Sequence, residues 1–240
     1  MKRIAIIPAR GGSKRIKNKN IKNFCGKPMI NYIIKSAKES KLFDKIHVST
    51  ESNLIKEVVE ESGLSIDFMR PENLSDDFTP LMPVLSFVLE SYKNMNIKFE
   101  EVWLLMACSP LVDKDDLISA SKVYADQDIN LTKPLLAIAE YPTPIEWSFL
   151  KDSNNILEPR YEGKFKERSQ DLPKSYYDSG TFVVFPISFI LEKGKEGSDK
   201  GYIGYEISRS KAIDIDTQTD WDFAESLFSL RNQKNNSFSK

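Results

Sequence analysis

A pair of glycines among lysines and arginines is the first group of residues that could do chemistry. Gly11 and Gly12 follow the apolar run of residues 4–7, and cations recur from Arg10 to Lys22. Glycine lets backbone N–H groups approach an anion closely, while serine, arginine and lysine add hydroxyl and charge-assisted hydrogen bonds. The stretch has neither the G-x-x-x-x-G-K-[ST] spacing of a P-loop nor the G-x-G-x-x-G of a dinucleotide fold. It therefore indicates a phosphate-binding loop of another kind, with a solvated basic loop as the alternative.

Two carboxylates near the other end of the chain, Asp214 and Asp216, form the second such group. They are expected at the end of a strand over residues 211–215, where the chain can bend so that both reach one ion. Mg²⁺ prefers carboxylate oxygens and keeps water and substrate phosphate as its other ligands. The alternative is that Asp216 is the N-cap of the last helix. Because a triphosphate needs both protein cations and a metal, the two groups together favour a nucleotide site.

The remaining polar residues offer fewer possibilities. Arg168 suits a planar carboxylate and Gln170 suits sugar hydroxyls, with a surface charge as the alternative for Arg168. His47 is the only histidine, so no Ser-His-Asp arrangement is available, and its alternation with apolar neighbours predicts a structural role. Cys25 and Cys108 show neither zinc nor disulfide spacing and are expected to be reduced thiols.

The composition excludes several classes of partner. The 240 residues include 34 basic and 35 acidic side chains, so general binding to nucleic acid or to a membrane surface is not expected. The apolar run at the N-terminus is too short for a signal peptide, and no stretch approaches the roughly 18 apolar residues of a membrane span. We therefore expect a soluble, cytoplasmic protein.

Strand and helix patterns alternate in the first part of the chain. Strands are expected over residues 4–7, 46–50, 66–70, 101–106 and 131–139, and helices over residues 28–37, 54–63, 81–89 and 113–124. Such repeats predict one α/β domain over residues 1–240, with a doubly wound, mostly parallel sheet. Right-handed crossovers place the loops that follow the strands at one edge of the sheet, where ligands of such folds bind.

The pattern changes after Glu140. Prolines and turn-forming residues over approximately residues 140–177 interrupt the alternation and predict an insertion. Strands at residues 180–186 and 211–215 and a helix over residues 217–230 are expected to complete the domain.

Six separated motifs, in order over nearly the whole chain, carry a family resemblance. They are residues 6–16 with Lys19 and Asn20, residues 26–28, residues 49–50, residues 70–71 with 74–76, residues 109–110, and residues 214–216. On these residues the chain resembles the CMP-sialic acid synthetases and their relatives, the acylneuraminate cytidylyltransferases. Residues 168–173, followed by residues 177–180, look most like the branch that activates pseudaminic acid. Residues 106–110 read Met-Ala-Cys-Ser-Pro, whereas enzymes for sialic acid itself tend to have Gln-Pro-Thr-Ser-Pro, which favours another nonulosonic acid.

The resemblance implies a Rossmann-like nucleotidyltransferase fold and a role for each candidate residue. The residues implied to hold CTP are Ala9, Arg10, Gly11, Gly12, Ser13, Lys19, Asn20, Arg70, Ser75 and Thr79. Asp214 and Asp216 would hold Mg²⁺, and Arg168, Gln170 and Asp178 would meet the sugar. The family is dimeric, so the insertion is implied to serve dimerisation and to reach toward the neighbouring subunit's site.

The implied reaction is nucleotidyl transfer from CTP to a nine-carbon α-keto sugar acid, with release of pyrophosphate. Arg10 and Lys19 would stabilise the developing charge, and Asp216, acting through water, is the candidate general base. One alternative keeps the fold and takes sialic acid or Kdo as the acceptor. Another is a nucleotide-binding regulatory protein that has lost the chemistry.

Overall fold

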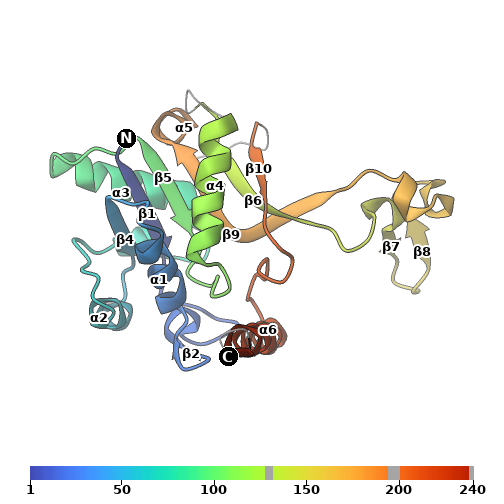
Figure 1. Ribbon diagram of the computed structural model, residues 1–240, viewed down its shortest axis with the longest axis horizontal. Helices are drawn as coiled ribbons and strands as arrows, with labels where there is room; N and C mark the ends of the chain where they lie inside the picture. The colour runs from blue at the N-terminus through green and yellow to red at the C-terminus, as the bar shows by residue number, and fades with distance from the viewer. Residues whose placement is uncertain (128–131, 194–200, 238–240) are drawn as a thin grey trace.

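The computed structural model describes residues 1–127, 132–193 and 201–237. A six-stranded sheet with the order β10-β6-β9-β5-β1-β4 forms its centre (Figure 1). The strands are β1 (Arg3–Pro8), β4 (Lys45–Ser49), β5 (Glu101–Leu105), β6 (Leu135–Glu140), β9 (Tyr176–Pro186) and β10 (Ile203–Glu206). β9 runs antiparallel to both of its neighbours, whereas the other pairs in this sheet are parallel. The prediction of a mostly parallel sheet is confirmed.

Helices cover both faces of this sheet, because successive side chains of a strand point to opposite sides. On one face Ala5 and Ile7 of β1 pack in a cluster with α1 (Ile30–Ser40), α2 (Asn53–Glu61) and α4 (Lys114–Gln127). On the other face Ile4 and Ile6 pack with α3 (Leu81–Asn94) and α5 (Ile187–Lys193). The sheet is therefore doubly wound, as predicted.

The last helix, α6 (Gln218–Ser237), lies beyond the carboxyl ends of the central strands (Figure 1). Its residue Trp221 packs with Phe24 of the short strand β2 (Asn23–Phe24), which pairs with β3 (Lys27–Pro28). Ile16 and Cys108, from the loops after β1 and β5, belong to the same cluster. This packing brings the C-terminal part of the chain to the edge where the basic loop lies.

Two of the predicted strands are wrong. Residues 66–70 are irregular, because Asp67 in the middle of the run accepts a hydrogen bond from the Tyr92 hydroxyl at 2.6 Å instead of extending a ladder. Residues 211–215 lie outside the sheet, since the chain turns there and the N–H of Lys211 donates to the Ser208 carbonyl at 2.8 Å. The edge strand is instead β10, whose four residues are too few for a periodic signal. Of the strand predicted at residues 131–139, the first residue lies outside the described chain, and β6 begins just after Pro134.

An arm leaves the sheet between β6 and β9 (Figure 1). It carries the hairpin of β7 (Phe149–Lys151) and β8 (Leu157–Pro159) and three 3₁₀ turns, η3 (Ile145–Trp147), η4 (Lys164–Lys166) and η5 (Ser169–Asp171). Apolar side chains on the arm are unusually open to solvent, among them Phe149, Leu150, Ile156, Leu157 and Phe165, which are 38–62% exposed. Phe149 and Phe165 pack edge to face at 5.2 Å, but an isolated hairpin of this size buries little core, so these side chains leave an apolar surface open to solvent in the described part of the chain.

His47 is confirmed as a structural residue. Its side chain is 1% exposed on β4, and Nδ1 lies 3.1 Å from the Tyr92 hydroxyl. Because that hydroxyl donates to Asp67, the His47 Nδ1–H is the donor in this pair. Burial lowers the pKa of His47 to about 4, so the imidazole is neutral at physiological pH. Among the described residues, no helix has the length and apolar character needed to cross a membrane.

Candidate active site

A cleft of about 260 Å³ lies at the carboxyl ends of β1 and β5. β1 pairs with β4 on one side and β5 on the other, so the chain reverses its winding direction at this point of the sheet. Crevices at such reversal points are the usual ligand sites of doubly wound folds. The predicted site residues that line the cleft are Arg10, Ser13, Lys19, Asn20, Arg70, Thr79 and Asp216. Residues far apart in the sequence therefore meet where the resemblance implies a nucleotide.

The glycine loop lies next to this cleft, but three residues predicted to hold CTP, Ala9, Gly11 and Gly12, do not line it. The Ala9 N–H donates to the Ser49 carbonyl at 2.9 Å, and the buried Asn20 donates its amide to the Arg10 carbonyl at 3.1 Å. A Cβ at Gly11 would lie 3.1 Å from the Ser52 Cβ, so any larger residue there would have to displace Ser52. Gly12 has open space around it. The Gly11 N–H already donates to a carboxylate oxygen of Glu51 at 2.6 Å, which shows that an anion fits this backbone.

Two aspartates hold the cations of the loop in pairs. Asp77 accepts Arg10 at 2.5 Å and also pairs with Lys14. Asp216 accepts Arg15 at 2.8 Å and Lys19 at 3.1 Å, and the Lys19 Nζ also donates to the Ile215 carbonyl at 2.7 Å. The hydrogen bond from Lys14, followed by that from Arg10, lowers the pKa of Asp77. Four cations thus converge on one cleft, where a polyanionic ligand would compete with these two carboxylates.

Asp216 is not the N-cap of the last helix, which was the alternative prediction for this residue. α6 begins at Gln218, and Thr217 precedes it as the cap: the Trp221 N–H donates to the Thr217 carbonyl at 3.1 Å. Asp220 completes a reciprocal capping box by accepting the Thr217 N–H at 2.7 Å. The Asp216 side chain is therefore directed to the loop cations, while its backbone N–H is held by Asp220 at 3.1 Å.

Asp214 lies beside the cleft, against Gly180 of β9. Gly180 has a φ of 63°, a conformation that favours glycine, and a Cβ at this position would be in van der Waals contact with the Asp214 side chain at 3.4 Å. Partial burial, followed by the negative charge of Asp216, raises the pKa of Asp214, although part of its surface is open to solvent. The two carboxylates repel each other, and a divalent cation would relieve that repulsion.

The carboxylate oxygens of Asp214 and Asp216 decide which kind of metal ion could bind here. Within the described ranges, no three Asp, Glu, His or Cys side chains converge on one point. Two carboxylates with open positions beside a basic cleft suit a hard cation that takes its remaining ligands from water and phosphate. They do not suit a closed structural zinc site, which needs four protein ligands.

Three of the residues predicted to hold CTP, Arg70, Thr79 and Ser75, differ in their surroundings. Arg70 is 6% exposed, and its guanidinium donates to the Ser49 carbonyl at 2.8 Å, so it holds the end of β4 while lining the cleft. Burial lowers the pKa of Arg70. Thr79 lines the cleft and donates its hydroxyl to Asp76 at 2.7 Å. Ser75 does not line the cleft, and its hydroxyl donates to the Pro71 carbonyl at 3.1 Å.

The residues assigned to the sugar are not brought together. Arg168 and Gln170 belong to the arm, which extends away from the sheet (Figure 1). Neither residue lines the cleft of the same chain, and Arg168 pairs with Asp171 at 2.7 Å. Asp178 lies at the base of β9, where it accepts the Gly180 N–H at 2.9 Å. A single chain therefore assembles the phosphate part of the site and leaves the arm residues outside it.

Several residues at the cleft were not singled out from the sequence. Arg15 lies in the predicted basic loop, but its pairing with Asp216 was not predicted, and neither Asp77 nor Glu51 was given a role of its own. Cys108 lines the cleft but is 6% exposed, and burial raises its pKa, so it is not an activated thiolate. The sequence offered one indication for Asp77: residues 10–22 carry more cations than acidic partners, and the polar residues 75–79 include two aspartates.

The sequence also matches known proteins over almost its whole length. The family described as cytidylyltransferase matches residues 4–239. The pseudaminic acid cytidylyltransferase of Campylobacter jejuni subsp. jejuni serotype O:2 is 36% identical over 233 residues, which cover 97% of this chain and 99% of that protein. The N-acylneuraminate cytidylyltransferase of Streptococcus agalactiae serotype V is 31% identical over 223 residues, covering 92% of this chain and 52% of that protein.

A solved structure supports the architecture. CMP:2-keto-3-deoxy-manno-octonic acid synthetase complexed with CTP matches with a TM-score of 0.71 at 15% identity, covering 96% of this chain and 100% of that one. At this identity the likeness concerns the fold alone, and it agrees with the Rossmann-like arrangement expected from the sequence.

Proposed function

We propose that this chain, which belongs to the cytidylyltransferase family, transfers CMP from CTP to a nonulosonic acid, most specifically pseudaminic acid. The observation that carries the proposal is the convergence of Arg10, Arg15, Lys19 and Asp216 on one cleft at the carboxyl edge of the sheet. That cleft has the charge and the position that a nucleoside triphosphate requires.

In the proposed reaction the anomeric hydroxyl oxygen of the sugar acid attacks the α-phosphorus of CTP. A new O–P bond forms, the bond to the β-phosphate oxygen breaks, and pyrophosphate leaves. Arg10 and Lys19 stabilise the negative charge that develops on the transferring and leaving groups. The hydroxyl proton passes through water to Asp216, which is the candidate base.

We propose Asp214 and Asp216 as the protein ligands of a Mg²⁺ ion that binds with CTP. Their donor set and mutual repulsion support this assignment. When bound, Mg²⁺ would neutralise phosphate charge and lower the pKa of the attacking hydroxyl. Lys19 and Arg15 pair with Asp216 in this structure, and when CTP binds they would pair with phosphate oxygens instead.

Replacing Asp77 with asparagine is expected to lower KM for CTP, on the order of 3-fold, with kcat nearly unchanged. Asp77 holds Arg10 and Lys14, and the triphosphate must take these cations from it. Steady-state kinetics with varied CTP measure the effect. The control is Glu61→Gln, which removes an exposed carboxylate at the end of α2 that does not line the cleft. A higher KM in Asp77→Asn would show that Asp77 helps to bind the nucleotide.

The acceptor is tested by incubating the protein with CTP, Mg²⁺ and a panel of sugar acids, and measuring pyrophosphate and the CMP-sugar by mass spectrometry. We expect pseudaminic acid to give the highest kcat/KM. A preference for sialic acid, legionaminic acid or Kdo would keep the family and change the substrate. If no acid in the panel supported CTP turnover, the proposed function would be contradicted and a nucleotide-binding regulatory protein would be favoured.

We further propose a homodimer in which the arm of one chain completes the sugar site of the other. The exposed apolar side chains of the arm and the distance of Arg168 from its own cleft support this arrangement.

Mixing Arg168→Ala and Lys19→Ala subunits tests whether the site is shared. Each variant alone should be nearly inactive. Random reassociation should restore roughly a quarter of the wild-type rate, because half of the dimers are mixed and each has one intact site. Light scattering confirms the assembly state. No recovery on mixing, with dimers present, would place Arg168 in its own chain's site or outside any site.

We also place the enzyme in the cytoplasm. Both cysteines, Cys25 and Cys108, are free, which suits a reducing compartment. Cell fractionation with an antibody against the protein would test this, and recovery outside the cytoplasmic fraction would contradict it.

A further inference from the structure

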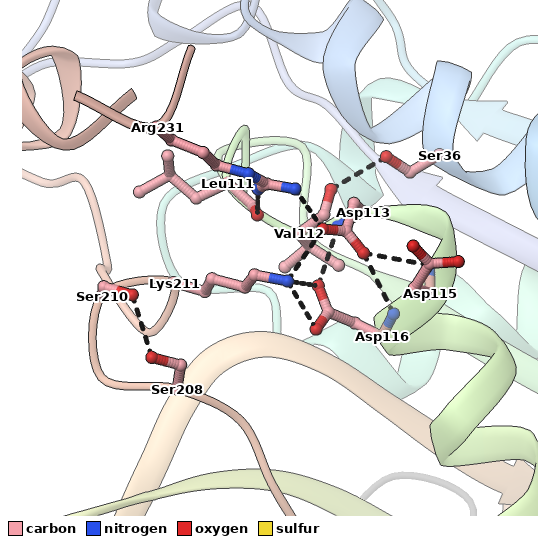
Figure 2. A network of polar contacts seen from close by, with 10 residues as sticks. All are labelled: Ser36, Leu111, Val112, Asp113, Asp115, Asp116, Ser208, Ser210, Lys211 and Arg231. Atoms are coloured by element: carbon pink, nitrogen blue, oxygen red, sulfur yellow. Dashed lines mark hydrogen bonds and ion pairs between the residues drawn. The ribbon is translucent and has the colours of Figure 1, made fainter. Parts of the chain in front are cut away.

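A network of charged side chains joins three elements beside the active site (Figure 2). The Lys211 Nζ donates to Asp113 at 2.8 Å and to both carboxylate oxygens of Asp116, at 2.8 and 2.7 Å. Arg231 of α6 pairs with the same Asp113 and donates to the Leu111 carbonyl at 2.9 Å. The network links the loop after β5, the turn that precedes Asp214, and α6.

The two carboxylates of this network are themselves held rigidly. Asp113 caps α4 by accepting the N–H groups of Asp115 and Asp116 at 3.0 and 3.1 Å. Asp116 returns the bond by accepting the Asp113 N–H at 2.9 Å, so the two form a capping box. Ser36 of α1 donates to the neighbouring Val112 carbonyl at 2.8 Å. Lys211 and Arg231 are therefore attached to a fixed point of the domain.

The attachment points flank the two aspartates in the sequence. Lys211 lies three residues before Asp214, and α6, which carries Arg231, begins two residues after Asp216. Residues 211–217 lie outside the helices and strands, so no ladder fixes the path of the chain there. Lys211 attaches the chain before the two aspartates, while between and after them the path depends on the burial of Ile215, on Lys19 at the Ile215 carbonyl and on Asp220, which accepts the Asp216 N–H.

We propose that Lys211, held by Asp113 and Asp116, is a positioning residue that sets Asp214 and Asp216 at the geometry needed for the divalent cation. This inference rests on the proposed function, because it assigns the two aspartates to that ion. Lys211 does not line the cleft. It acts through the segment that it anchors, as outer contacts of metal ligands do.

The test compares Lys211→Met with Lys38→Met. Lys38 is a matched control, because it also ties two segments together, donating to the Ser62 and Gly63 carbonyls at 2.8 and 3.0 Å far from the cleft. A double variant, Lys211→Met with Asp116→Asn, removes the tie without leaving an unpaired carboxylate. Lys211→Arg keeps a cation at this position.

Three measurements are made on the full-length protein: the Mg²⁺ concentration for half-maximal pyrophosphate release, Mn²⁺ binding in the presence of CTP by electron paramagnetic resonance, and amide hydrogen exchange of residues 208–217. We expect the half-saturating Mg²⁺ concentration and the Mn²⁺ dissociation constant to rise about 10-fold in Lys211→Met and the double variant. Exchange of the segment should be faster, kcat at saturating Mg²⁺ should stay within a few-fold, and Lys211→Arg should restore most of the metal affinity.

The proposal would be overturned if Lys211→Met and the double variant kept the wild-type metal affinity and lost thermal stability as Lys38→Met does. The network would then be a purely structural tie. If the wild-type protein released no pyrophosphate with any sugar acid, the proposed function would fail. The Mn²⁺ and exchange comparisons would still decide whether Lys211 positions the two aspartates.

Discussion

Replacing Asp214 with asparagine is expected to reduce kcat/KM for CTP-dependent pyrophosphate release on the order of 10³-fold. A carboxylate ligand fixes a metal whose Lewis-acid effect is worth several kcal/mol in such reactions, and each 1.36 kcal/mol corresponds to a factor of ten in rate. The asparagine side chain would keep the size of the aspartate against Gly180 and lose its charge. The measurement is the rate as a function of Mg²⁺ concentration at saturating CTP and sugar.

The free energy of unfolding of Asp214→Asn distinguishes a loss of catalysis from a loss of folding. Burial and Asp216 raise the pKa of Asp214, so the folded protein holds its proton to a higher pH than the unfolded chain does. Between the two pKa values stability falls as pH rises, and at neutral pH the ionised Asp214 disfavours the native state. Without metal, the free energy of unfolding of Asp214→Asn should therefore be unchanged or slightly higher.

The control for Asp214→Asn is Asp222→Asn. Asp222 is an exposed carboxylate on α6 that accepts a hydrogen bond from Gln218 at 2.7 Å and does not line the cleft. It should leave kcat/KM within about twofold, as most surface substitutions do. Full activity in Asp214→Asn would remove this residue from the metal site and leave Asp216 as the single carboxylate assigned to it.

The parts of the fold that the sequence predicts are those with strong local periodicity. The buried runs of β1 and β5 and the apolar stripe of α1 read correctly, because burial on both faces or on one helix face imposes a repeating pattern. Residues 66–70 and 211–215 carry the composition of strands, yet their own side chains Asp67 and Lys211 make contacts with distant residues that local patterns do not report. The short β10 left no periodic signal at all.

In the active site, too, local features could be predicted from the sequence, whereas contacts between distant residues could not. Glycine and cations in the basic loop predict an anion site from their chemistry alone, and four of these cations, Arg10, Lys14, Arg15 and Lys19, line the cleft, whereas the two glycines do not. The pairing of Arg10 with Asp77 spans 67 residues, and that of Lys19 with Asp216 spans 197, so only the folded chain brings them together. The position of Arg168 depends on a second chain in the proposed dimer, which no pattern within one sequence can specify.

Lys19→Ala is expected to lower kcat by about 10²- to 10³-fold, the usual loss when one preorganised donor to a developing charge is removed. The Lys19 side chain is 17% exposed at the start of η1 (Lys19–Ile21), and its Nζ is held at 2.7 Å by the Ile215 carbonyl. This carbonyl fixes the ammonium beside Asp216, where phosphate oxygens would lie, before the substrate arrives. KM for CTP should rise less than kcat falls, because three other cations still attract the triphosphate.

The matched control for Lys19→Ala is Lys17→Ala, which removes the same charge two residues away from an exposed side chain that does not line the cleft. If the cations of the loop act only through their summed field, the two variants should slow the reaction equally and both effects should disappear at high salt. If Lys19 acts at its fixed position, its loss of kcat should persist at high salt while Lys17→Ala stays near the wild-type rate. Equal behaviour of the two variants would remove Lys19 from the mechanism and leave Arg10 as the cation assigned to the transferring phosphoryl group.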